Sequence, residues 1–123
     1  MAATDDFIVF IEELLAGLGP VTTKRMFGGA GVFADGVMFG LIADDTLYLK
    51  ADAATQPVFK AEGLSPFVYP GKSRPIAMSY WRIPNRLYDS PEELCAWARD
   101  ALVVARRVDA KRLMSTRPSG LKR

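Results

Sequence analysis

The chain has 123 residues, of which half are hydrophobic and 24% are charged, and its formal net charge is +2. This length fits one domain that can bury a core without metals or disulfides. No stretch approaches the roughly 18 apolar residues that span a bilayer, and the acidic start at Asp5 and Asp6 makes a poor export signal. The single cysteine, Cys95, is typical of a reducing compartment. We therefore predict a cytoplasmic protein.

Basic residues concentrate towards the C-terminal end. After residue 105 the chain carries seven basic residues and one acidic residue, so the preceding part is net acidic. Such a segment suits nucleic acid or an acidic partner, but cations also favour the negative end of a helix dipole. We favour the second interpretation, because no aromatic residue able to stack on a base follows Trp97. The basic residues are Arg106, Arg107, Lys111, Arg112, Arg117, Lys122 and Arg123.

The first predicted element is an amphipathic helix. Apolar residues recur at spacings of three and four between Phe7 and Leu18, which is the pattern of a helix with one buried face. Thr4 can cap the start of this helix, and Gly19-Pro20 ends it.

A strand-rich block follows between residues 21 and 50. Asp35-Gly36 separates two β-favouring runs, residues 31–34 and 37–42, and is a hairpin signal because the tight turn needs positive φ. A second turn at residues 44–46 leads to a strand over residues 47–50. Connections this short predict an antiparallel meander.

The second half of the chain predicts a short helix over residues 55–62, strands over 67–69 and 76–83, and a long last helix. Ser90-Pro91-Glu92-Glu93 is a strong helix start, since it combines a capping serine, an early proline and the glutamate of a capping box. We expect this helix to fray around Leu113. Residues 1–110 are thus predicted to form the domain, and residues 111–123 a mobile basic tail.

These elements predict an α+β domain with two layers. We expect a five-stranded antiparallel sheet with helices on one face, in the order helix, three strands, helix, two strands, helix. The second face of the sheet is left for solvent, a ligand or a partner, including a second copy of the chain.

The catalytic inventory is thin. The sequence has no histidine, which removes the commonest general base and the commonest zinc ligand. Cys95 is interpreted as a small helix residue rather than a nucleophile. We therefore predict no enzyme activity, no catalytic residues, no metal and no cofactor.

The glycine-rich segment Gly28-Gly29-Ala30-Gly31 is the most distinctive local feature. A strand rather than a helix follows it, so no helix dipole points at an anion, and a bend or bulge between two strands is the favoured interpretation. Lys24 and Arg25 precede it, and a small anion site at these residues stays open as an alternative. The aromatic residues of the strands are likewise interpreted as core rather than as a platform for nucleic-acid bases.

Four linked motifs together resemble the TfoX N-terminal domain family: Arg25-Met26-Phe27-Gly28-Gly29, Gly31-Val32-Phe33, Asp35-Gly36-Val37-Met38-Phe39 and Leu41 to Asp52, the last including Tyr48 and Lys50. The later Pro66-Phe67, Met78 to Trp81 and the last helix are similar to the same family, so that the resemblance covers about residues 5–107.

This resemblance implies a fold like that of secretion chaperones and a non-enzymatic role in the control of bacterial competence for DNA transformation. TfoX proteins act with the cAMP receptor protein in transcription and carry a second, helical domain, which we expect this chain to lack. The leading hypothesis is a regulatory module that contacts a protein partner, with a homodimer as one form. The alternatives are direct binding of nucleic acid through the basic tail, in which Lys24, Arg25, Arg106, Arg107, Lys111 and Arg112 take part, and binding of a small anion at the Gly28–Gly31 loop.

Overall fold

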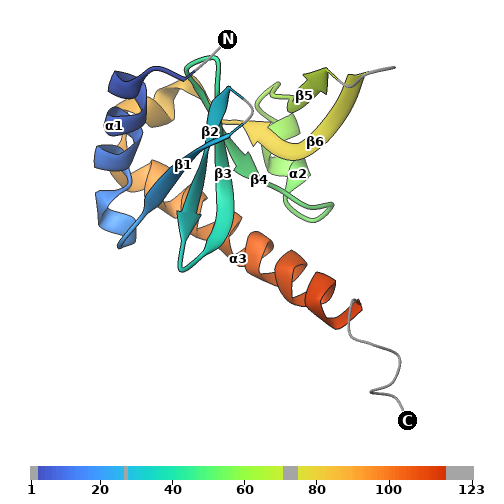
Figure 1. Ribbon diagram of the computed structural model, residues 1–123. Coiled ribbons are helices and arrows are strands. Elements are labelled where there is room, and N and C mark those ends of the chain that lie inside the picture. The colour runs from blue at the N-terminus through green and yellow to red at the C-terminus, as the bar shows by residue number, and fades with distance from the viewer. Residues whose placement is uncertain (1–2, 27, 71–74, 116–123) are drawn as a thin grey trace.

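The computed structural model describes residues 3–26, 28–70 and 75–115. Figure 1 shows a curved sheet with helices packed on one side and a long last helix that runs out past the sheet. In chain order the elements are α1 (Asp5–Leu14), η1 (Ala16–Leu18), β1 (Thr22–Met26), β2 (Gly29–Ala34), β3 (Val37–Ala43), β4 (Thr46–Lys50), α2 (Gln56–Lys60), β5 (Pro66–Pro70), β6 (Pro75–Arg82), η2 (Asn85–Asp89) and α3 (Pro91–Ser115).

The sheet confirms the α+β class but corrects the strand number. Within the described residues it has six antiparallel strands rather than five, in the order β1-β2-β3-β4-β6-β5. The strand that the prediction missed is β1, a polar edge strand without the apolar alternation that marks a half-buried strand. Gly29, Ala30 and Gly31 also belong to a strand, β2, because β1 pairs with all three and β3 pairs with Ala30 and Gly31.

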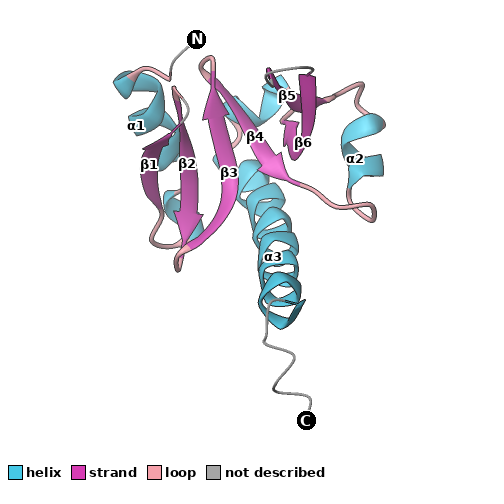
Figure 2. Cartoon of the chain, turned by 45° about the vertical axis from the view of Figure 1, so that its right-hand side comes forward, coloured by secondary structure: helices cyan, strands magenta, loops and turns pink. Residues whose placement is uncertain are grey.

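The core lies between one face of this sheet and the helices. Ala30, Val32 and Ala34 of β2 alternate towards it, as do Leu47 and Leu49 of β4. Figure 2 shows α3 lying behind the sheet, with α1 near β1 and α2 near β6. The buried helical residues that complete the core are Ile8, Ile11, Leu14, Phe59, Leu94, Cys95, Ala98, Ala101, Leu102 and Ala105.

Both predicted tight turns are confirmed by their backbone angles. Asp35 and Gly36 have φ of 52° and 78°, and Asp44 and Asp45 have φ of 57° and 51°. The second turn has no glycine at these two positions, because aspartate tolerates this conformation better than most residues do. The Asp45 carboxylate accepts a hydrogen bond of 2.8 Å from the backbone N–H of Thr4, so this turn also fixes the start of α1.

The ends of the two long helices follow the sequence signals only in part. Thr4 caps α1 as predicted, since its hydroxyl accepts a 3.2 Å hydrogen bond from the N–H of Phe7. Helix α3 begins at Pro91 as predicted, but Glu93 pairs with Arg86 at 3.0 Å, and no Ser90 side-chain bond completes a capping box in the described part of the chain. Helix α3 continues to Ser115, and residues 116–123 of the predicted tail lie outside the described residues.

No helix in residues 3–26, 28–70 and 75–115 is both long enough and apolar enough to cross a membrane.

The close contact of β2 with β3 makes Gly29 the least replaceable glycine of the described chain. A Cβ atom at Gly29 would lie 2.1 Å from the carbonyl oxygen of Ile42, whereas one at Gly17 would lie 3.6 Å from the Sγ of Cys95. We expect Gly29→Ala to lower the free energy of unfolding by about 1–3 kcal/mol, because the backbone of β3 must shift. Gly17→Ala should change it by less than about 0.5 kcal/mol. Urea unfolding followed by tryptophan fluorescence measures both, and equal stabilities would contradict this account.

Candidate functional site

On the face of the sheet opposite the core, strand β2 carries glycines at two alternate positions, Gly29 and Gly31. The strand register places Gly31 of β2 opposite Leu41 of β3, and Leu41 opposite Tyr48 of β4, so these residues share that face. A Cβ atom at Gly31 would lie 2.9 Å from the Cε of Met26 and 3.1 Å from the Sδ of Met38. The two methionine side chains therefore fold down over β2 because glycine leaves them the space.

A cavity of about 290 Å³ opens on this face. Its lining comes from β1 and β5, which are the two edges of the sheet, and from β2, β3 and β6 between them. The sheet must therefore curve around the cavity, and we call this side the concave face. The lining residues are Met26, Gly29, Met38, Leu41, Ile42, Ala43, Phe67, Met78 and Tyr80.

The walls of the cavity are apolar and partly rigid. Leu41 and Tyr80 are buried here outside the main core, and the Tyr80 hydroxyl donates a 3.4 Å hydrogen bond to the carbonyl oxygen of Met38. Burial raises the pKa of Tyr80, so this donor stays protonated at neutral pH. The ring of Phe67 meets that of Tyr48 edge-on at 5.2 Å. Three methionines add adaptable side chains, which suit a surface that must fit an apolar partner group.

Lys50 lies at the end of β4, beside this face. Its ammonium donates a 2.6 Å hydrogen bond to the hydroxyl of Ser79 and lies 5.0 Å from the centre of the Tyr80 ring. Burial lowers the pKa of Lys50, because a partly desolvated amine is harder to protonate.

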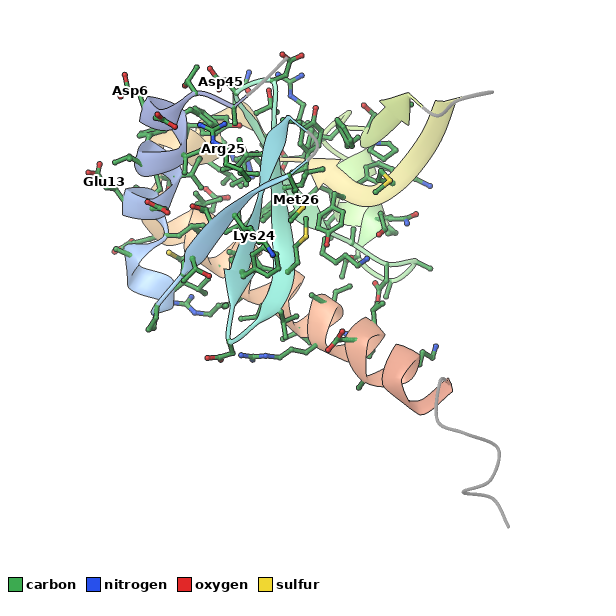
Figure 3. All side chains as sticks on the ribbon, in the orientation of Figure 1. Asp6, Glu13, Lys24, Arg25, Met26 and Asp45 are labelled. Atoms are coloured by element: carbon green, nitrogen blue, oxygen red, sulfur yellow. The ribbon has the colours of Figure 1, made fainter. Side chains whose placement is uncertain are left out.

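The two predicted cations of β1 lie on opposite faces of the sheet, because Lys24 stands opposite Gly31 of the concave face and Arg25 stands opposite Ala30 of the core face. Figure 3 shows Arg25 on the side of β1 that faces α1, with Met26 directed away from that helix. The Arg25 guanidinium donates to the carbonyl oxygen of Ala3 at 2.7 Å and pairs with Asp5, so it ties the start of α1 to the sheet. Lys24 is exposed on the edge strand.

The predicted cations of α3 fasten that helix to the sheet. Arg106 pairs with Asp35 of the β2–β3 turn at 2.9 Å, and Arg107 pairs with Asp52 after β4 at the same distance. Lys111 is exposed, and the side chain of Arg112 lies outside the described residues. The structure therefore separates the cations of β1 from those of α3, and no shared contact joins the two groups among the described residues.

The glycine-rich segment confirms the favoured interpretation only in part, because Gly28 alone lies in the connection between two antiparallel strands, whereas Gly29 to Gly31 belong to β2. Gly28 has φ of 79° in the connection from β1 to β2, and its carbonyl oxygen accepts a 3.2 Å hydrogen bond from Ala3. Phe27 lies outside the described residues. The anion site predicted for Gly28–Gly31 stays a prediction.

Sequence reasoning expected a free second face but missed the residues that give it shape, namely Met38, Leu41, Phe67 and Met78. The available signal was the pair of glycines at alternate positions of one strand, facing methionines in its neighbours.

The match of the whole domain to known proteins decides the family. Residues 13–105 match the model of the TfoX N-terminal domain, which is well over half of the chain.

The chain belongs to the TfoX N-terminal domain family.

A curated relative, the DNA transformation protein TfoX1 of Aliivibrio fischeri, is 26% identical over 96 residues. That match covers 78% of this chain but only 44% of the relative, so the chain spans less than half the length of this TfoX protein. The motif residues of the TfoX resemblance acquire structural roles here: Gly28 and Asp35-Gly36 form turns, Gly29 and Gly31 admit close neighbours, and Arg25 holds α1.

The lowered pKa of Lys50 predicts a signature in stability. Because the unfolded chain then binds more protons than the folded chain, the free energy of unfolding should rise with pH between the folded and unfolded pKa of this amine. Lys50→Met removes this pH-dependent contribution. The difference in the free energy of unfolding between the wild-type protein and Lys50→Met should therefore shrink or reverse as pH rises through this window. Urea unfolding across the alkaline range measures it. A difference independent of pH would contradict the burial of this amine.

Proposed function

We propose that this chain is a non-enzymatic regulatory module of DNA transformation, which works in the cytoplasm by contacting a protein partner through its concave face. The family match over residues 13–105 and the relationship to a DNA transformation protein support the process. The shape and chemistry of the concave face support the mode of action.

The apolar hollow is the main observation that supports a protein contact through the concave face. A cavity of about 290 Å³ bordered by Met26, Met38 and Met78 accepts one large apolar side chain of a partner. Buried anchors of this kind dominate the binding energy of protein interfaces, and methionines adapt their rotamers to the anchor. Met78 is 36% exposed, so it can meet a partner without rearrangement of the core.

The proposal extends the role of the family to a chain that spans 44% of its curated relative. A component of the transcription machinery is the partner expected from the family, and a second copy of the chain is the other occupant that the test must distinguish. Direct binding of nucleic acid receives no comparable support, because Arg25, Arg106 and Arg107 are engaged in ion pairs within the domain.

A charge placed in the hollow should abolish the function without unfolding the protein. In a strain that lacks the native gene, we expect Met78→Lys to restore DNA transformation at least about tenfold less well than the wild-type chain, since an ammonium buried in an apolar contact is heavily penalised. Val9→Lys is the matched control, because Val9 is 50% exposed on α1, away from the concave face.

The transformation frequency per viable cell is the readout, with circular dichroism to verify that both variants fold. Equal restoration by Met78→Lys and by Val9→Lys would contradict the proposed surface. No loss of transformation on deletion of the gene would contradict the proposed process. Sedimentation of wild type and Met78→Lys shows whether a second copy occupies the face, since only the wild type would then dimerise.

A further inference from the structure

A second cavity, of about 370 Å³, lies at the end of the sheet where α3 passes the β2–β3 turn and the last residue of β4. Phe33, Val37, Met38 and Tyr80 line it from the sheet, and Val108 lines it from α3. This cavity shares the walls Met38 and Tyr80 with the apolar hollow but has one feature that the hollow lacks, the ammonium of Lys50.

The Lys50 ammonium has no counter-ion in the described chain. Its contacts are the neutral hydroxyl of Ser79 at 2.6 Å and the Tyr80 ring at 5.0 Å. Asp109 borders the same cavity and Asp100 the smaller one on the other side of Lys50, yet neither carboxylate lies within ion-pair distance of the amine. A half-buried cation without a counter-ion carries a desolvation penalty that a bound anion would offset.

The wall that α3 gives to this cavity is fixed in place. The ion pairs Arg106–Asp35 and Arg107–Asp52 hold the helix against the turn and against the segment after β4. Because these two guanidinium groups are paired, they do not compete with Lys50 for an anion.

We propose that this cavity binds a small amphipathic carboxylate, whose anionic head pairs with the Lys50 ammonium and whose apolar body lies on Phe33, Val37, Met38 and Val108. The Ser79 hydroxyl is a positioning group, since it holds the ammonium at the cavity wall. The ligand is thus recognised by two features at once, one negative charge and an unbranched or aromatic apolar body of a size that a 370 Å³ cavity admits.

Sodium octanoate is the probe, and octanamide is its neutral counterpart with the same chain. Calorimetric titration of the full chain at pH 7 should show that octanoate binds at least about tenfold more tightly than octanamide, because a charge-assisted hydrogen bond is lost in the amide. Lys50→Met should remove this preference, and Lys50→Arg should keep it. Lys60→Met is the matched control, as Lys60 also lies over an aromatic ring, Trp81 at 6.0 Å, but borders neither cavity.

Methionine methyl signals locate the ligand. Met38 lines both cavities, whereas Met26 and Met78 line only the hollow, so octanoate should shift the Met38 methyl and leave the other two unchanged. Affinity should also fall with rising pH as Lys50, whose pKa is lowered by burial, loses its proton, while Tyr80, whose pKa is raised by burial, stays neutral until higher pH. Asp100 and Asp109 are the acidic residues that border the cavities beside Lys50. Three results would overturn the proposal: no binding of octanoate, equal binding of octanamide, or shifts confined to Met26 and Met78. None of them bears on the transformation assay, in which Met78→Lys alters a different cavity.

Discussion

The structure depends on two glycines, Gly29 and Gly31, at alternate positions on the concave side of β2. Gly29 allows the backbone of β3 to approach so closely that a Cβ atom would lie 2.1 Å from the carbonyl oxygen of Ile42. Gly31, two residues on, makes room for Met26 and Met38. On the other face of the same strand, Ala30, Val32 and Ala34 pack into the core. One strand thus builds a filled core on one side and a hollow on the other, because alternate residues point to opposite faces.

Three arginines hold helices against the sheet and do not form a free charged surface for a ligand. Arg25 ties the start of α1 to β1, while Arg106 and Arg107 tie α3 to the far end of the sheet. Exposed ion pairs contribute little energy individually, so their value lies in orientation. They place α3 beside Lys50, for which no carboxylate partner is found among the described residues. The proposed protein contact and the proposed carboxylate site therefore occupy neighbouring but chemically different cavities.

Much of the fold could be predicted from the sequence because its signals are local. The residue types at two turns, Asp35-Gly36 and Asp44-Asp45, predict backbone with positive φ. Thr4 and Pro91 predict where two helices begin. The edge strand β1 was missed because Thr22 to Arg25 lack apolar alternation and owe their pairing to β2. The predicted capping box does not form, because the Glu93 carboxylate pairs instead with Arg86. Only the tertiary structure brings these two side chains together.

The candidate site could be predicted only as a free sheet face, because its shape depends on the curvature of the sheet. Met26 and Phe67 come from opposite edges and share a cavity only once the six strands curl. Likewise, the pairing of Lys50 with Ser79 depends on the contact of β4 with β6, strands between which α2 and β5 intervene in the chain. Local sequence patterns contain neither relationship, although the family motifs include most of the residues involved.

Xenon enters apolar cavities, so it can show whether the glycines of β2 leave an open apolar hollow on the concave face. Methionine methyl spectra under xenon pressure should show shifts of Met26, Met38 and Met78 in the wild-type protein. In Gly31→Leu these shifts should vanish, since the new side chain pushes Met26 and Met38 into the space. Identical xenon responses of the two proteins, or no response of the wild type, would contradict the account.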